Sequence, residues 1–527
     1  MSAAAAGEPA FLGLTEPFFD LLPRFPHFIK MLFHALQWPF PAVLGYTPLA
    51  PRLLSLSAAC LALLFFHRTV GALARGSEPA PSFGRSLSSG RLSISFGTVS
   101  LLALDIQFIY AAHFGRQEIL LMAALTAALW LYLRSEQTAV DGQFGMGHRG
   151  AAMVIGLSIG IHPNAFLISL PIGAFLLVDL VIALVRAAAA GGPCSRVGQV
   201  LRHGLEYAGI LAAWAGLYVG LSYLLDPQFL SHYAAFGDRV GVAEPLYIKA
   251  FRFPDFYQKL YYRISGTYYT PAIQLQFFLF GAALVAAPIT ALLYRGPSAL
   301  LRRRLIQLPA ALLLLNIGTL VLGKYSQPSI VLHFPLYYLL IATLLLAWTG
   351  RTGRPLLFRS LVLWALLAAT AANSGYNIAQ ELHLLSPKPR EYYETYTQYG
   401  HKLHSFVPPD ATVLANLNAE YHFDHGRLYD YRNLAYLDEA RLSFDEYIEK
   451  NNIEYIVYPE EMDLIYNRRP MWNILYGNVA GYYDEMQQFL GRQCTEVGHF
   501  ESPIYGMRIT RYMGRRPWKV TVYRVNN

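Results

Sequence analysis

Charged residues are scarce in this sequence. Asp, Glu, Lys and Arg make up only 14% of its 527 residues, whereas 54% are hydrophobic. An ordinary soluble domain carries about 25% charged residues, so the composition excludes a typical soluble protein. Several apolar stretches reach or approach the roughly 20 residues that a helix needs to cross a bilayer. The sequence therefore predicts an integral membrane protein.

Cysteine and the common nucleotide and hydrolase motifs are also lacking. Cys60, Cys194 and Cys494 are far apart, which excludes a disulfide framework and the close cysteine spacing of a metal site. There is no phosphate-binding P-loop, no His-Glu-x-x-His, no nucleophile elbow and no dinucleotide fingerprint. The formal charge is +8, but in a membrane protein an excess of Lys and Arg usually reports orientation. We expect no nucleic-acid partner.

The apolar stretches predict a polytopic α-helical membrane protein with about ten transmembrane helices. The predicted spans cover residues 52–67, 94–112, 118–133, 150–161, 165–185, 205–225, 272–294, 306–323, 330–349 and 356–374. The fourth span is short and forms a tight hairpin with the fifth, broken at "GIHPNAF".

The loops that connect these spans are alternately rich and poor in basic residues. One set of loops carries Arg68, Arg75, Arg85, Arg91, Arg134, Arg149, Arg186, Arg196, Arg202, Arg295, Arg302, Arg303, Arg304, Arg351, Arg354 and Arg359. The short loops of the other set hold chiefly Arg116 and Lys324. The positive-inside rule places the arginine-rich set in the cytoplasm. The outer face then carries the hinges 113–117, 162–164 and 324–329, the long loop 226–271 and the chain after about residue 375.

The composition changes near "HLLSPKPREYY", and residues 388–527 are typical of a water-soluble α/β domain. "TVLANL", "IEYIVY", "MRITRYM" and "KVTVYRV" are predicted strands. "SFDEYIEKNN" predicts a helix capped by Ser443, and "VPPDAT" predicts a turn. We expect a transmembrane domain over 51–375 followed by this extracytoplasmic domain.

Residues 1–50 are apolar but broken by prolines and charges, as in "FFDLLPRFPHFIKMLFHALQWPFP". This pattern predicts amphipathic helices that lie on the outer membrane interface. The topology needs residue 1 outside, and no predicted span brings it there. Either the short tail is translocated or a first span lies upstream of this start.

The three outer hinges carry polar groups that suit a catalytic site. These groups are His113, Arg116 and Glu118 in the first hinge, His162 and Asn164 in the second, and Lys324, Tyr325 and Gln327 in the third. A carboxylate beside basic residues suggests a base next to an anion site, and ionisable groups at a membrane boundary are functional candidates. The alternative is that these charges only anchor helix ends in water.

Three further segments have two interpretations each. Asp105, inside the second predicted span, either lines a substrate pocket or makes an interhelical hydrogen bond that fixes packing. The aromatic and basic loop 226–271 either caps a lipid-phosphate substrate or anchors the chain at the interface. "EYHFDHGRLYD" groups His422, Asp424 and His425, and a solvated turn is favoured over a metal site.

Four segments follow one another in an order that matches a known pattern. They are "FPHFIKMLFHAL" with "LGYTPLAPRLLSLSAACLAL", which holds Arg52 and Ser55; "FIYAAHFGRQEILLMAALTAALWLYLR" with Glu118; "GLSIGIHPNAFLISLPI" with His162 and Asn164; and "GKYSQPSIVLHFPLYYLLIA" with Lys324 and Tyr325. Together with the C-terminal domain they resemble the GT-C class of membrane glycosyltransferases. The resemblance is to the bacterial relatives of protein O-mannosyltransferases and of the lipid A aminoarabinose transferase. Many relatives have a Lys-Gly pair where this sequence has His162, Pro163 and Asn164.

The resemblance implies a donor in which a polyprenyl phosphate carries one sugar. It also implies inverting transfer to a hydroxyl of a lipid, glycan or protein, without a nucleotide, an obligatory cofactor or an obligatory metal. On this hypothesis the donor phosphate binds to Arg116, Lys324, His162 and Tyr325. The substrate pocket is lined by His113, Asn164 and Asp105. Arginine suits phosphate because its planar fork makes two parallel hydrogen bonds.

The catalytic base is a point of departure from this family. Its members usually carry an Asp, often Asp-Glu, in the first outer loop just after a first span, and this sequence has neither. Asp20 or Glu16 is then the base, or the base lies upstream of this start. Glu118 is either the base or the residue that orients Arg116, and the closeness of the two opposite charges favours orientation.

Two other classes of protein compete with the glycosyltransferase. A transporter or lipid flippase explains the spans and Asp105, but a transport path needs polar groups near the midplane. A non-catalytic membrane scaffold explains the missing Asp-Glu pair. The gathering of polar hinges on one face favours the glycosyltransferase. We expect it in a bacterial plasma membrane, with its C-terminal domain outside the cytoplasm.

Overall fold

The computed structural model describes residues 20–21, 27–75, 87–137, 146–190, 195–239, 244–262, 274–294, 298–322, 327–349, 394–423, 427–508 and 517–526, with single residues or short runs between 361 and 382. The chain divides into two compact units. The helical unit comprises His27–Phe40 and Pro51–Ile378. The C-terminal unit comprises Met1–Pro26, Pro41–Ala50 and Ala379–Asn527.

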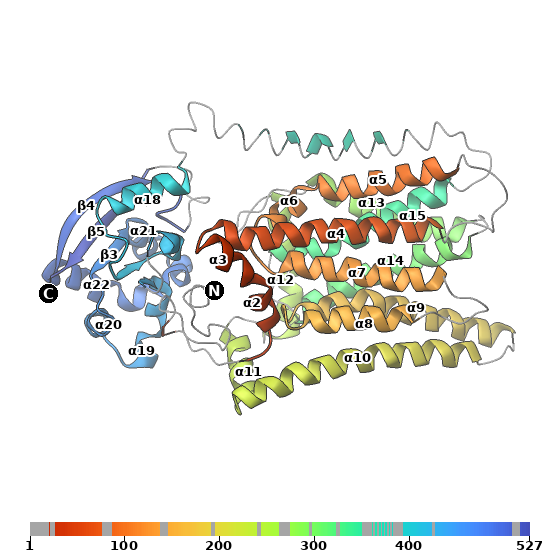
Figure 1. The fold of residues 1–527 in the computed structure, drawn as a ribbon, viewed down its shortest axis with the longest axis horizontal. Coiled ribbons are helices and arrows are strands. Elements are labelled where there is room, and N and C mark those ends of the chain that lie inside the picture. Colours follow the sequence, from red (N-terminus) through yellow and green to blue (C-terminus); the bar gives the residue numbers. More distant parts are fainter. Residues whose placement is uncertain are drawn as a thin grey trace. The chain divides into compact units, whose positions relative to one another are not determined.

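Long apolar helices build the helical unit (Figure 1). Its elements are α2 (Met31–Gln37), α4 (Leu49–Arg75), α5 (Leu87–Ala103), α6 (Ile106–Ala112), α7 (Glu118–Gln137), α8 (Gly147–Ser158), α9 (Ala165–Ala190), α10 (Ser195–Leu225), α11 (Phe229–Arg239), α12 (Leu246–Tyr262), α13 (Gln274–Leu293), α14 (Ala299–Leu322), η3 (Gln327–His333) and α15 (Phe334–Thr349). Short α3 (Pro39–Leu44) follows α2. Among the described residues, seven helices are long and apolar enough to cross a membrane, or up to eight with the bent pair of α5 and α6. The polytopic helical prediction is confirmed.

The helices differ in how much of their apolar surface other helices cover. Some 94% of the most apolar part of Ser329–Trp348 is buried, whereas only 11% is buried in Arg196–Leu225. A helix that is hydrophobic all round belongs in a core or in lipid. We infer that α15 is central and that α10 faces lipid. Helices α9 and α14 pack along each other, and α8 packs between α7 and α10 (Figure 1).

Several predicted boundaries need correction. The span over 94–112 is broken at Asp105, and its two halves meet at 64°. The predicted fourth span is α8, whose 12 residues cover only about 18 Å and cannot cross a hydrocarbon core of about 30 Å. It does form the expected hairpin with α9. The loop 226–271 contains the helices α11 and α12, because its aromatic residues recur at helical spacing. The span over 356–374 lies mostly outside the described residues.

The C-terminal unit is an α/β domain. Its elements are α18 (Tyr396–His404), β1 (Val413–Ala415), η4 (Leu417–His422), β2 (Leu428–Asp430), η5 (Tyr431–Tyr436), α19 (Leu437–Ala440), α20 (Phe444–Lys450), β3 (Tyr455–Pro459), α21 (Glu461–Arg468), η6 (Pro470–Tyr476), α22 (Val479–Gln493), β4 (Cys494–Ser502) and β5 (Trp518–Val525). The sheet order is β2-β1-β3-β5-β4. Strands β2, β1 and β3 are parallel, and β3, β5 and β4 are antiparallel.

Both faces of the central strands are buried. Leu414 belongs to one hydrophobic core with Phe444 and Met486, whereas its neighbour Val413 belongs to a second core with Tyr399. This alternation follows from the two-residue period of a strand. It explains why β1 and β3 are apolar throughout and were predicted from sequence.

Three of the four predicted strands are confirmed as β1, β3 and β5. The strand predicted at "MRITRYM" is irregular at Met507 and Arg508, and its remainder lies outside the described residues. Strands β2 and β4 were missed, and β2 falls in the segment interpreted as a solvated turn. The helix at "SFDEYIEKNN" is α20, with Ser443 in a reciprocal capping box with Glu446.

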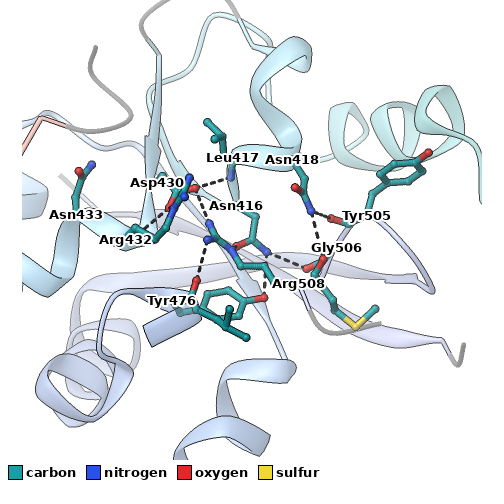
Figure 2. A network of polar contacts seen from close by, with 12 residues as sticks. Asn416, Leu417, Asn418, Asp430, Arg432, Asn433, Tyr476, Tyr505, Gly506 and Arg508 are labelled. Carbon is teal, nitrogen blue, oxygen red and sulfur yellow. Dashed lines mark hydrogen bonds and ion pairs between the residues drawn. The ribbon is translucent and has the colours of Figure 1, made fainter. Parts of the chain in front are cut away.

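A polar network closes the carboxyl ends of β1 and β2 (Figure 2). Arg508 donates to Asp430 Oδ2 at 2.5 Å, to Asn416 Oδ1 at 2.8 Å and to the Leu475 carbonyl at 2.8 Å. Asp430 is fully buried and also accepts from Arg432. Ligands of α/β sheets often bind at this edge. In this domain the side chains of Asn416, Asp430 and Arg508 occupy that edge of the sheet.

Candidate functional site

Arg116 and Glu118 form an ion pair at the hinge between α6 and α7. Arg116 donates from Nε to Glu118 Oε2 at 3.1 Å and from Nη2 to Oε1 at 2.7 Å. The Glu118 side chain is 3% exposed and that of Arg116 is 27% exposed. Gly115 turns the chain here with φ +66, and a Cβ at this position would meet Pro51 at 3.3 Å. The two parallel hydrogen bonds therefore hold Arg116 in one orientation at the surface of the helical unit.

His113 ends α6 and is exposed. Its Nδ1 lies 2.7 Å from the Ile109 carbonyl, which can only accept, so Nδ1 carries the proton. The predicted role of His113 in the substrate pocket stays a prediction.

The second hinge places a neutral histidine close to the first. The Asn164 backbone N–H donates to His162 Nδ1 at 3.0 Å, so Nε2 carries the proton. Burial, reinforced by the positive charges of Lys30 and Arg116, lowers the pKa of His162 to about 3. His162 is therefore within electrostatic reach of both cations and offers a hydrogen bond without a charge.

The third hinge lies against the other two. Asn164 Nδ2 donates to Ser329 Oγ at 3.5 Å across 165 residues of sequence. Ser329 belongs to η3, which packs against α6 and α7. The first two predicted hinges and the described residues Gln327–Ser329 of the third therefore gather at one end of the helical unit. Lys324 and Tyr325 lie outside the described residues, so their predicted roles stay predictions.

Lys30 is a residue that the sequence interpretation missed. It precedes α2 with φ +78, a left-handed conformation that costs a non-glycine residue roughly 1 kcal/mol or more. The Phe33 N–H donates to the Gly160 carbonyl at 3.2 Å, which ties α2 to the turn that precedes His162. The sequence signal was a lone cation in the apolar segment "FPHFIKMLF", which had been assigned to the membrane interface and to the family resemblance without a role for Lys30.

A carboxylate and a histidine were also missed at this end. His232 Nδ1 lies 2.6 Å from Asp226 Oδ2, and Asp226 is buried whereas the His232 side chain is 44% exposed. The Phe28 N–H donates to Ser222 Oγ at 2.9 Å, which joins the end of α10 to the segment before Lys30. Asp226 and His232 were not identified from the long loop in the sequence, because they pair only when α11 forms.

Asp105 is fully buried at the break between α5 and α6. Its Oδ1 accepts from the N–H groups of Gln107 at 2.8 Å and Phe108 at 3.4 Å, which caps α6. Its Oδ2 accepts from the Tyr338 hydroxyl on α15 at 2.5 Å. This geometry corresponds to the packing interpretation of Asp105. Its role in a substrate pocket stays a prediction.

Asp20 belongs to the C-terminal unit. Its carboxylate accepts from the Tyr447 hydroxyl at 2.9 Å and from Asn451 Nδ2 at 3.3 Å, both near α20. Burial raises the pKa of Asp20 above its ordinary value. Its role as the base stays a prediction. In the described part of the chain, no group of three or more His, Cys, Asp or Glu residues is placed to hold a metal ion.

Comparison with known proteins bears on the fold. Neither a protein-family model nor a curated protein matches this sequence. The structure is similar to that of ArnT from Cupriavidus metallidurans bound to undecaprenyl phosphate, with a TM-score of 0.52 and 12% identity. The match covers 99% of this chain and 91% of that chain. The protein therefore has the GT-C membrane fold that its sequence motifs resemble.

A second solved structure is more distant. The oligosaccharyltransferase of Archaeoglobus fulgidus, in complex with Zn and sulfate, gives a TM-score of 0.44 at 12% identity. The match covers 93% of this chain and 65% of that chain. At this distance it supports no argument about this protein.

Proposed function

We propose that this protein is an inverting glycosyltransferase that moves a sugar from a polyprenyl-phosphate donor to an extracytoplasmic acceptor hydroxyl. The observation that carries the proposal is the Arg116–Glu118 pair, an arginine held in one orientation whose charge, like that of Lys30, acts on a neutral His162. The GT-C fold supports it, since the similar ArnT structure contains undecaprenyl phosphate.

In this proposal the cationic hinge binds the donor phosphate. Two of the five guanidinium N–H groups of Arg116 point at Glu118, and in the complex the oriented guanidinium also binds phosphate oxygens. Lys30 adds a second positive charge, and the predicted Lys324 a third. His162 donates from Nε2 without adding charge.

The reaction is a single displacement at the anomeric carbon. The acceptor oxygen forms a bond to this carbon as the bond to the phosphate oxygen breaks from the opposite face. Polyprenyl phosphate leaves with an extra negative charge, which Arg116 and Lys30 stabilise as it develops. The acceptor proton passes to a general base.

We assign Glu118 to orientation, because both of its oxygens accept hydrogen bonds from Arg116. Among the residues that the structure describes, two candidates for the base then remain; Glu16 lies outside them. Asp20 is the candidate from the sequence. The Asp226–His232 pair is the second, since a buried carboxylate that fixes a partly exposed imidazole is a common arrangement of a histidine base.

The setting follows from the same proposal. The hinges face the outside of the bacterial plasma membrane, the C-terminal unit lies outside the cytoplasm, and the acceptor is a lipid, glycan or protein. The arginine-rich loops support this orientation through the positive-inside rule.

The test is sugar transfer by the purified full-length chain in liposomes. A panel of polyprenyl-phosphate sugars is offered together with extracted envelope acceptors. The variants are Arg116→Ala, Asp20→Asn and His232→Gln, with Arg134→Ala as a control at the far end of α7. We expect Arg116→Ala to lower transfer sharply while leaving it measurable, and Arg134→Ala to retain it.

The same assay separates the alternatives. A collapse in only one of Asp20→Asn and His232→Gln identifies the base. Absence of transfer from every donor, together with undecaprenyl phosphate binding that Arg116→Ala leaves unchanged, would favour the scaffold and reject the proposed function.

A further inference from the structure

A cavity with three arginines lies at the end of the helical unit opposite the hinges. It has a volume of about 190 Å³ and is lined by Arg186, Arg196, Arg303, Asp179 and the first residues of α14. On the same measure a single water needs roughly 10–15 Å³, so the space is ample for a phosphate group. Along α9, Asn164 and Arg186 are about 33 Å apart at 1.5 Å per residue. The cavity is therefore distinct from the candidate active site.

The carboxylates around this cavity are already neutralised by other arginines. Arg303 donates to both oxygens of Asp179 and to Glu136 Oε1, the latter at 2.9 Å. Arg304 pairs with the second oxygen of Glu136. Two negative charges are thus balanced by two positive charges.

Arg186 and Arg196 remain as excess positive charge. Both side chains belong to exposed residues. In the part of the chain that the structure describes, neither has a carboxylate within ion-pair distance. Among the described residues around the cavity, four arginines exceed two carboxylates by a net positive charge of two, and the charge of Asp179 acts on Arg196 as well as on Arg303.

Two helix N-termini add to this positive potential. Ala299 and Leu300, the first two residues of α14, line the cavity, and so does Arg196 in the first turn of α10. The first N–H groups of a helix lack intrahelical partners, and the helix dipole is positive at this end. The Leu301 N–H of α14 already donates to Ser298 Oγ at 3.2 Å, so the helix dipoles, not free N–H groups, add to the arginines, and this positive potential favours a phosphate.

The position of the cavity along α9 indicates which kind of molecule would bring a phosphate to it. The membrane-crossing part of α9 ends at Ala189, and Arg186 lies within its last turn. We propose that this arginine cavity binds the phosphate of an anionic phospholipid in the leaflet opposite the hinges. The lipid fills the space between α9, α10 and α14 and stabilises their ends. This site does not depend on the proposed sugar transfer.

The test is native mass spectrometry of the full-length chain in detergent, with phosphatidylglycerol or phosphatidylethanolamine added. The variant is Arg186→Ala/Arg196→Ala. The control is Arg68→Ala/Arg134→Ala, which removes two exposed arginines at the same end of the bundle, both stacked on Trp130. Arg186→Lys/Arg196→Lys tests whether charge alone suffices.

We expect wild type and the control to retain phosphatidylglycerol in preference to phosphatidylethanolamine. Arg186→Ala/Arg196→Ala should bind it about 30-fold more weakly, which is about 2 kcal/mol at 1.4 kcal/mol per tenfold, and the lysine variant should retain most of the binding. Equal loss in both alanine variants, or no preference for phosphatidylglycerol in wild type, overturns the proposal. Binding of inorganic phosphate without binding of phosphatidylglycerol also overturns it and identifies a free-anion site.

Discussion

Glu118→Gln replaces one carboxylate oxygen with an amide group that faces the Arg116 guanidinium. In the native pair, Arg116 donates two hydrogen bonds of 3.1 and 2.7 Å to a side chain that is 3% exposed. Glutamine can accept only one of them and leaves two donors facing each other. A hydrogen bond to a charged group contributes about 1.5–3 kcal/mol.

If Glu118 acts by orienting Arg116, this loss appears in binding of the donor phosphate. At about 1.4 kcal/mol per tenfold, kcat/KM should fall about 10- to 150-fold. Binding of undecaprenyl phosphate should weaken by a similar factor, and Glu118→Asp should restore part of it. Removal of a general base would also lower the rate about 10²- to 10⁴-fold, so the size of the loss does not separate the two roles.

A double-mutant cycle separates them. In an Arg116→Ala background, an orienting Glu118 has nothing left to orient, and adding Glu118→Gln should change kcat/KM less than about twofold. A catalytic base would instead give losses that multiply. The reasoning is refuted if Glu118→Gln leaves donor binding unchanged and lowers kcat further in the Arg116→Ala background.

Three other predictions follow from buried or strained groups. His162 has a pKa of about 3 in the folded protein, against about 6.5 in the unfolded chain. Between these pH values the unfolded state binds more protons than the folded state. The folded protein therefore loses stability as the pH falls from about 6.5 to 3. Thermal unfolding in detergent should show a smaller loss between pH 7 and pH 4 for His162→Gln, and an identical pH dependence contradicts this assignment. Lys30→Gly should raise the unfolding temperature, because glycine adopts φ +78 without strain, and it should weaken binding of undecaprenyl phosphate, because the positive charge is lost. Lys30→Ala removes the same charge. Weaker binding in Lys30→Ala but not in Lys30→Gly rules out a role for the charge. Asp430→Asn leaves Arg508 without its buried partner and should lower the free energy of unfolding of the C-terminal unit by about 3–5 kcal/mol. Urea-dependent proteolysis of the full-length chain measures this loss. The exposed control Asp438→Asn should change stability little, and equal losses in the two variants contradict the prediction.

The predicted elements succeeded where the signal is local. The capping box of Ser443 involves residues three apart, and the strands β1 and β3 are short apolar runs, so neighbouring residues were enough to define them. Strand β4 was missed because it contains exposed polar residues, and its pairing with β5 defines it. The break at Asp105 was missed because an apolar stretch shows its length but not the interhelical hydrogen bond that Tyr338 supplies.

The sequence by itself determined the membrane class, the GT-C resemblance and the set of polar hinges, because hydropathy and motif order are properties of consecutive residues. Only the tertiary structure decided which polar groups meet. The bond between Asn164 and Ser329 spans 165 residues, and the influence of Lys30 on His162 arises because Phe33 binds Gly160. Such contacts depend on how helices distant in sequence pack, and packing is set by the whole unit at once.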